Sequence, residues 1–251
     1  MKASLNSKIG LFIPCYIDQF YPQVGKATLE LLEKLGCDVD YPLNQTCCGQ
    51  PMGNSGSEKE SKKTAELFVT NFQLYDYIVA PTGSCVCYVK EHYDIIEKTK
   101  GTKHVRENIY ELSEFIIDIL RIDKINAVFP HKVGLHSSCH GQRGLRLAQS
   151  SEINAPYFSK QKQLLSMVEG IEIITIDRPD ECCGFGGTFC VTEEAVSVKM
   201  GKDKVADFMR NGAEVITAGD ESCLMHMEGI IKREKYPINV LHLAEILNSI
   251  L

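Results

Sequence analysis

Eight of the eleven cysteines in the sequence fall into two sets of four, and thiolates arranged in this way could bind metal. Each set consists of one cysteine, then an adjacent Cys-Cys pair followed by glycine, then a last cysteine. The sets are Cys15, Cys47, Cys48 and Cys85, and then Cys139, Cys182, Cys183 and Cys223. Thiolates are soft ligands that suit iron–sulfur clusters, zinc or Cu(I). We therefore predict all eight as metal ligands.

The Cys-Cys pair in each set favours a multinuclear cluster over a single zinc ion. Side chains of adjacent residues diverge along the backbone, so they chelate one tetrahedral ion poorly, but they can bind different irons of one cluster. The pair does not exclude zinc. The glycine after each pair, Gly49 or Gly184, would allow backbone to approach the sulfurs closely. Free thiols also fill cores, but that role would explain neither the repetition nor the pairs.

Three further cysteines and one histidine lie near these sets without clearly belonging to them. We expect Cys37 to be an ordinary core residue and Cys190 to be structural. Cys87 and His226 follow the last cysteine of the first and second sets, and for both a ligand role stays open.

Three polar residues surround the first cysteine of the second set, Cys139. A functional interpretation has Arg143 holding a substrate carboxylate while His136 or His140 moves its proton. The structural alternative is that these side chains hydrogen-bond loop carbonyls beside the metal centre. The sequence therefore identifies no catalytic residue.

The cysteine sets lie within a longer internal repeat. Residues 8–11 resemble residues 132–135, and residues 76–80 resemble residues 214–218, in the same order relative to the cysteines. Each half alternates short apolar runs with longer amphipathic ones, which is typical of parallel sheets covered by helices. We predict an α/β fold of two similar cysteine-rich halves, each a small parallel sheet with helices, related by a pseudo-two-fold axis. The predicted domains are residues 1–107, a helical connection 108–130, and residues 131–251.

The apolar periodicity predicts individual elements in both halves. The expected strands are 9–13, 39–41, 77–80, 133–136, 171–176 and 215–218, and the expected helices are 24–35, 57–74, 109–120, 161–168, 193–209 and 241–250. The cysteines follow the strands or lie in adjoining loops. Because ligands bind at the carboxyl edge of open α/β sheets, we expect the sites there.

Composition excludes several other classes of protein. The 251 residues carry a formal net charge of −6, and no basic run suggests a nucleic-acid partner. No apolar stretch approaches the roughly 20 residues that a membrane span needs. The polar start of the chain lacks the apolar core of a signal peptide, so we expect a cytoplasmic protein. In a reducing cytosol, clustered cysteines more often bind metal or do redox chemistry than form structural disulfides.

Longer motifs around the cysteines carry a family resemblance. The repeated pattern resembles the cysteine-rich CCG domain found in heterodisulfide reductase and in iron–sulfur subunits of glycolate and anaerobic glycerol-3-phosphate dehydrogenases. Further motifs make the match closer: Cys47-Cys48-Gly49-Gln50-Pro51, His136-Ser137-Ser138-Cys139-His140, Cys182-Cys183-Gly184-Phe185-Gly186-Gly187-Thr188-Phe189, Ser222-Cys223-Leu224-Met225-His226 and His242-Leu243-Ala244-Glu245. With these motifs the sequence resembles, over essentially the whole chain, the lactate-utilisation protein A family.

The resemblance implies an iron–sulfur redox subunit that transfers electrons in a multi-subunit system oxidising L-lactate to pyruvate. The implied partners are two other lactate-utilisation subunits, one of them ferredoxin-like, and the chain is not expected to be active alone. The CCG domains of heterodisulfide reductase have a fifth thiol for each non-cubane cluster. Here Cys87 comes one residue early and His226 replaces the second thiol, which favours one or two [4Fe-4S] clusters. The alternatives are a zinc- or thiol-based scaffold of the complex and a heterodisulfide-reductase-like thiol/disulfide redox protein.

Overall fold

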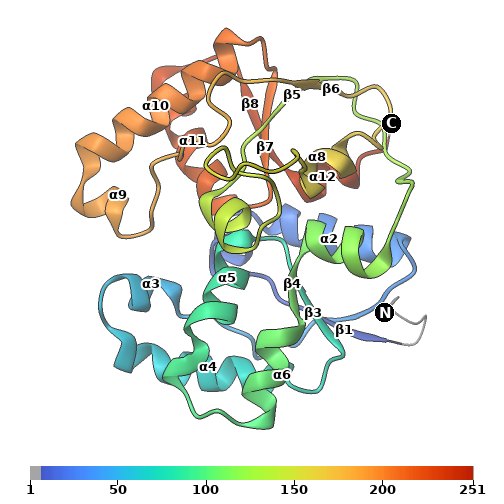
Figure 1. Cartoon of the computed structure of the whole chain (residues 1–251), viewed down its shortest axis with the longest axis vertical. Coiled ribbons are helices and arrows are strands. Elements are labelled where there is room, and N and C mark those ends of the chain that lie inside the picture. The colour runs from blue at the N-terminus through green and yellow to red at the C-terminus, as the bar shows by residue number, and fades with distance from the viewer. Residues whose placement is uncertain (1–6, 251) are drawn as a thin grey trace. The chain divides into compact units, whose positions relative to one another are not determined.

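The computed structural model describes residues 7–250, which form two compact units divided between Arg121 and Ile122 (Figure 1). Each unit contains one four-stranded parallel sheet with helices. The α/β fold with two similar halves is therefore confirmed. The pseudo-two-fold axis and the domain limits stay predictions, although the division between the units falls inside the predicted connection.

In the first unit the strand order is β2-β1-β3-β4, with every neighbouring pair parallel. The strands are β1 (Lys8–Leu11), β2 (Asp38–Asp40), β3 (Tyr77–Ala80) and β4 (Ile109–Glu111). The helical segments are α1 (Cys15–Phe20), α2 (Pro22–Lys34), α3 (Gln50–Asn54), α4 (Glu58–Phe72), α5 (Gly83–His92), η1 (Tyr93–Ile95), α6 (Lys100–Asn108), α7 (Leu112–Glu114) and η2 (Phe115–Leu120).

An aromatic cluster forms part of the core of this unit. Phe12, directly after β1, packs edge-on against Phe68 of α4 with their ring centroids 4.8 Å apart. Phe72 and Tyr93 extend the cluster, and all four side chains are fully or almost fully buried. These contacts fix α4 against the end of β1 and so hold the loop that leads into α4.

The second unit has the equivalent strand order β6-β5-β7-β8, again all parallel. The strands are β5 (Lys132–Leu135), β6 (Glu172–Ile174), β7 (Val215–Ala218) and β8 (Asn239–His242). The helical segments are η3 (His140–Gly144), α8 (Lys160–Leu165), α9 (Phe189–Thr192), α10 (Glu194–Arg210), α11 (Glu221–Glu234) and α12 (Leu243–Leu247). The long helices α10 and α11 pack side by side in this unit (Figure 1).

Two segments that the periodicity assigns to helices begin instead as strands. Residues 109–111 form β4, and residues 241–242 are the end of β8; β4 pairs with β3 and β8 with β7 before a helix follows. The helices after both strands are capped by the last strand residue: the Glu111 carboxylate accepts the Ser113 N–H at 2.7 Å, and His242 Nδ1 accepts the Ala244 N–H at 3.1 Å. Pairing with a neighbouring strand therefore outweighs the local helical period.

Across the described residues, every helix is too short or too polar to cross a lipid bilayer.

Candidate metal centres

The three loops that carry each cysteine set begin at the carboxyl ends of three adjacent strands. In the first unit they follow β1, β2 and β3, and in the second they follow β5, β6 and β7. The carboxyl ends of parallel strands meet at one edge of a sheet, so loops far apart in sequence converge there. The sites therefore lie at the predicted edge of each sheet.

The four thiols of the first set are linked by successive contacts. The Sγ atoms of Cys15 and Cys47 are 3.6 Å apart, and the thiol of Cys48 hydrogen-bonds with those of Cys47 and Cys85. Cys48 is only 1% exposed, whereas the other three are half-buried. The hydroxyl of Tyr93 donates to the carbonyl of Cys48 at 2.9 Å and fixes the backbone of the pair.

The second set repeats these contacts in the same order. The thiol of Cys139 hydrogen-bonds with that of Cys182, and Cys183 contacts both Cys182 and Cys223. Cys183 and Cys223 are buried within the apolar core of the unit, and the other two are half-buried. The structure therefore brings the eight sequence-predicted cysteines together as two groups of four.

A glycine N–H points at one sulfur in each group. Gly49 N–H donates to Cys47 Sγ at 3.4 Å, and Gly184 N–H donates to Cys182 Sγ at 3.3 Å. Both glycines have positive φ, 93° and 91°, a conformation that side chains disfavour. The glycine after each pair thus allows the close backbone approach that the sequence predicts.

One thiol of each group is poised to ionise. Hydrogen bonds from the thiols of Cys15 and Cys48, followed by those from backbone N–H groups, lower the pKa of Cys47 well below its usual value despite its burial. The corresponding hydrogen bonds from Cys139 and Cys183 lower the pKa of Cys182 in the same way. Because the thiolate is the form in which cysteine binds metal, this ionisation is compatible with the predicted ligand role.

The last cysteine of each set lies in the first turn of a helix. Cys85 is the third residue of α5 and Cys223 the third residue of α11. The unpaired N–H groups and the dipole at a helix N-terminus favour negative charge there. Neither α5 nor α11 is among the elements that the periodicity predicts.

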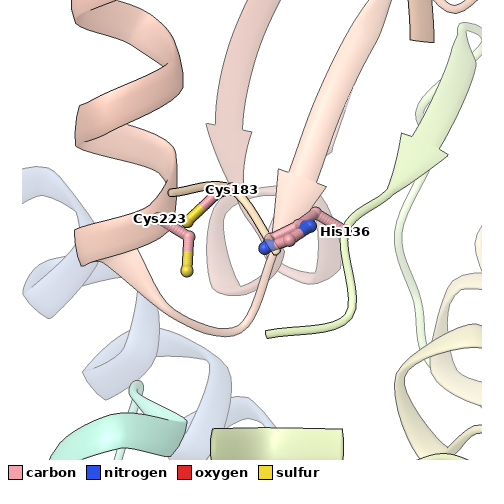
Figure 2. Close-up of side chains that lie close together, drawn as sticks. All are labelled: His136, Cys183 and Cys223. Atoms are coloured by element: carbon pink, nitrogen blue, oxygen red, sulfur yellow. The ribbon is translucent and has the colours of Figure 1, made fainter. Parts of the chain in front are cut away.

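The surroundings of His136 differ from what the sequence predicts. It directly follows β5, its N–H donates to Thr217 O at 2.7 Å, and its side chain is fully buried. One ring nitrogen lies with the Sγ atoms of Cys183 and Cys223 in a group whose members are within 4.8 Å of one another (Figure 2). Neither ring nitrogen has a hydrogen-bond partner among the described residues, so the expected bond to a loop carbonyl is not made. Burial, and then the charge of Lys204, lower the pKa of His136 to about 3, which keeps the ring neutral.

His226 is turned toward another element. Its Nε2 lies 3.3 Å from the carbonyl oxygen of Ser197 on α10, and its ring packs near Phe185. The counterpart in the first half, Tyr88, hydrogen-bonds with the side chain of Ser61, the matching residue of α4. This shared position indicates a structural contact between helices.

The remaining candidates also make local contacts. Arg143 forms an ion pair with Glu152, with Nε 2.5 Å from Oε1, so a substrate carboxylate would have to displace Glu152. The thiol of Cys190 donates to the carbonyl of Gly187 at 3.0 Å. Cys37, expected in the core, is only partly buried, and this burial raises its pKa to about 11. Cys87 is buried on α5 two residues after Cys85, a spacing that directs two helical side chains to different sides.

We expect Gly184→Ala to destabilise the protein more than Gly212→Ala. Both glycines have positive φ, so both alanines incur a backbone cost of about 1–2 kcal/mol. A Cβ at Gly184 would also lie 2.6 Å from the backbone oxygen of Ser197, whereas a Cβ at Gly212 meets nothing within 4 Å. Such overpacking costs about 1–3 kcal/mol more. Urea unfolding of the two variants measures the difference, and equal losses would contradict the close approach at the pair.

Comparison with known proteins agrees with this arrangement. The cysteine-rich CCG domain matches residues 9–90 and 133–228, which contain the two cysteine sets. A Lactate utilization protein A from Bacillus licheniformis is 40% identical over 246 residues, covering 96% of this chain and 99% of that protein. One from a Geobacillus species is 39% identical with the same coverage.

One solved structure shares the fold. A hypothetical protein from Helicobacter pylori superposes with a TM-score of 0.56 at 12% identity, covering 96% of this chain, which spans 48% of that one. The two halves thus define a protein built from cysteine-rich CCG domains. With near-complete coverage at 40% identity, the chain belongs to the lactate utilization protein A family.

Proposed function

We propose that this chain is a cytoplasmic iron–sulfur redox subunit of a multi-subunit system that oxidises L-lactate to pyruvate. The observation that carries the proposal is the convergence of four thiols in each half, with a glycine N–H directed at one of them. The relatives named Lactate utilization protein A support lactate as the compound involved.

The donor set fits an iron–sulfur cluster in both halves. Thiolate sulfurs are the ligands of such clusters, and N–H···S hydrogen bonds and burial are the features by which proteins tune them. The ligands we assign are Cys15, Cys47, Cys48 and Cys85, and Cys139, Cys182, Cys183 and Cys223. A bound [4Fe-4S] cluster supplies one-electron transfer, and four thiolates from each half would hold one.

The protein's own residues place each group at the boundary between core and surface. Cys48 and Cys183 are 1% and 2% exposed, whereas Cys47 and Cys182 are half-buried. The inner thiols therefore exclude water from one side of the site, while the outer thiols remain accessible. This arrangement suits a centre that exchanges electrons with a partner protein.

The chemistry of lactate itself is assigned to the partners. Oxidation of L-lactate to pyruvate releases two electrons and two protons, which requires a paired-electron acceptor and a base for the hydroxyl proton. The sequence carries neither a GxGxxG fingerprint nor a ferredoxin-type cysteine run. We propose that two other lactate-utilisation subunits, one of them ferredoxin-like, complete the system.

Anaerobic purification with metal analysis tests the proposal. We expect a brown protein with broad visible absorption that contains iron and acid-labile sulfide. A colourless protein that contains one zinc ion per site and no sulfide would overturn it.

A zinc-stabilised scaffold is the second candidate, and one observation favours it. His136, Cys183 and Cys223 offer one nitrogen and two sulfurs within 4.8 Å of one another. Ligand atoms around a single tetrahedral zinc lie about 3.3–3.8 Å apart, given bonds of about 2.0–2.3 Å. The same metal analysis distinguishes the two candidates.

A further inference from the structure

We propose that His136 is a nitrogen ligand of the metal centre in the second half, so that the two centres of the chain are chemically different. The first half would offer thiolates alone, and the second thiolates with an imidazole. This inference rests on the proposed function only in holding that the second cysteine set binds metal.

The environment of His136 gives the first reason. Its ring is fully buried, and neither nitrogen has a hydrogen-bond partner in the described part of the chain. Burying such a group without a partner is unfavourable, so a buried imidazole normally finds one. In Figure 2 a ring nitrogen points toward the sulfurs of Cys183 and Cys223, which are the nearby groups able to share a metal with it.

The first half shows that the fold does not need a histidine at this place. Phe12 is the counterpart of His136: each directly follows the first strand of its unit. Each also donates its N–H to the adjacent central strand, Phe12 to Val79 O at 2.9 Å and His136 to Thr217 O at 2.7 Å. At this position the first half has an apolar ring packed on Phe68.

The side chain next to this position also differs between the two halves. Phe68 follows Ser61 by seven residues on α4, and Lys204 follows the matching Ser197 by seven residues on α10. The Lys204 ammonium donates to the carbonyl of Arg178 at 2.6 Å and lies 5.4 Å from the centroid of the Phe208 ring. The second half therefore has histidine and lysine where the first has a buried aromatic pair, and of these two side chains only that of lysine makes hydrogen bonds among the residues that the structure describes.

The chemistry of the donors fits this role. Imidazole nitrogen and thiolate sulfur occur together as ligands of both zinc and iron–sulfur centres. Two of the three donors, Cys183 and Cys223, already belong to the set of four thiols. His136 therefore adds a fifth donor to the second half alone, whereas Phe12 adds none to the first.

Pulsed electron paramagnetic resonance on the reduced, anaerobically purified full chain tests the inference. We expect a strong nitrogen hyperfine coupling that changes when the protein is labelled with ¹⁵N-histidine. His136→Phe should abolish this coupling, because phenylalanine has no ring nitrogen. The variant should fold, because the first half has phenylalanine in the same place. His226→Gln, a nearby histidine that contacts Ser197 instead, should leave it unchanged.

The outcomes separate this inference from the proposed function. Clusters without a histidine-dependent coupling would overturn the inference and leave the proposed function intact. If the chain holds zinc instead of iron, the proposed function fails, and zinc-edge X-ray absorption decides the inference. Imidazole scattering that disappears in His136→Phe would support it, and sulfur scattering alone would refute it.

If His136→Phe fails to fold, the wild-type protein with labelled histidine still shows whether any imidazole is bound. Persistence of the coupling in both His226→Gln and His140→Gln would then support His136 as its source. Absence of a label-dependent coupling in the wild type would refute the inference.

Discussion

Cys48→Ser should remove the metal centre of the first half, and Cys183→Ser should remove that of the second. Each is the innermost thiol of its group and contacts two other cysteines of the set, so its loss interrupts the group at its centre. A serine hydroxyl is a hard and weakly acidic donor that replaces a thiolate poorly at iron. We expect each variant to lose the iron and sulfide of one half, and the double variant to lose all of it.

In the assembled lactate-oxidising complex, either substitution should reduce activity to that of a complex without this chain. Cys37→Ser is the matched control, because Cys37 is a partly buried cysteine outside both sets. It should retain most of the iron and most of the activity. Full activity in the double variant would show that the cysteine groups have no part in the reaction.

The isolated chain should not oxidise L-lactate, whereas the complex reconstituted without oxygen should do so with an artificial electron acceptor. A four-thiolate [4Fe-4S] centre transfers one electron at a time, and lactate oxidation requires two together with a base. The measurement is pyruvate formation by the chain alone, by the partners alone and by all three subunits.

Only the full mixture is expected to give sustained turnover. The control mixture contains the Cys48→Ser/Cys183→Ser chain, which keeps the protein surface nearly unchanged because both residues are buried. Robust pyruvate formation by the metal-free single chain would contradict the assignment of lactate chemistry to the partners.

The repeated cysteine motifs predict the two-unit α/β fold because they mark equivalent loops after equivalent strands. The central strands β3 (Tyr77–Ala80) and β7 (Val215–Ala218) have the predicted bounds, since continuous apolar runs mark strands buried in a sheet. The fourth strands differ. Residues 109–111 become a strand only through pairing with β3, and that pairing is not visible in the local pattern.

Part of the candidate site can likewise be predicted from the sequence, and part cannot. The cysteines can be assigned from spacing alone, because each set has the same composition and order. The role of His136 depends on which side chains meet its ring, including Lys204 from helix α10, which comes much later in the sequence. Alignment of the two halves at Phe12 and His136 is the sequence signal that could have singled out this residue.

Addition of L-lactate to the oxidised complex, in the absence of oxygen and of any acceptor, is the most direct test of electron transfer through this chain. We predict that the visible absorption of the iron–sulfur centres in this subunit bleaches and that a paramagnetic signal appears. The Cys48→Ser/Cys183→Ser complex should lack the part of both changes that belongs to this subunit. If the wild-type complex forms pyruvate in a parallel assay with an acceptor, but lactate alone leaves the centres of this subunit oxidised, electron transfer through them is contradicted.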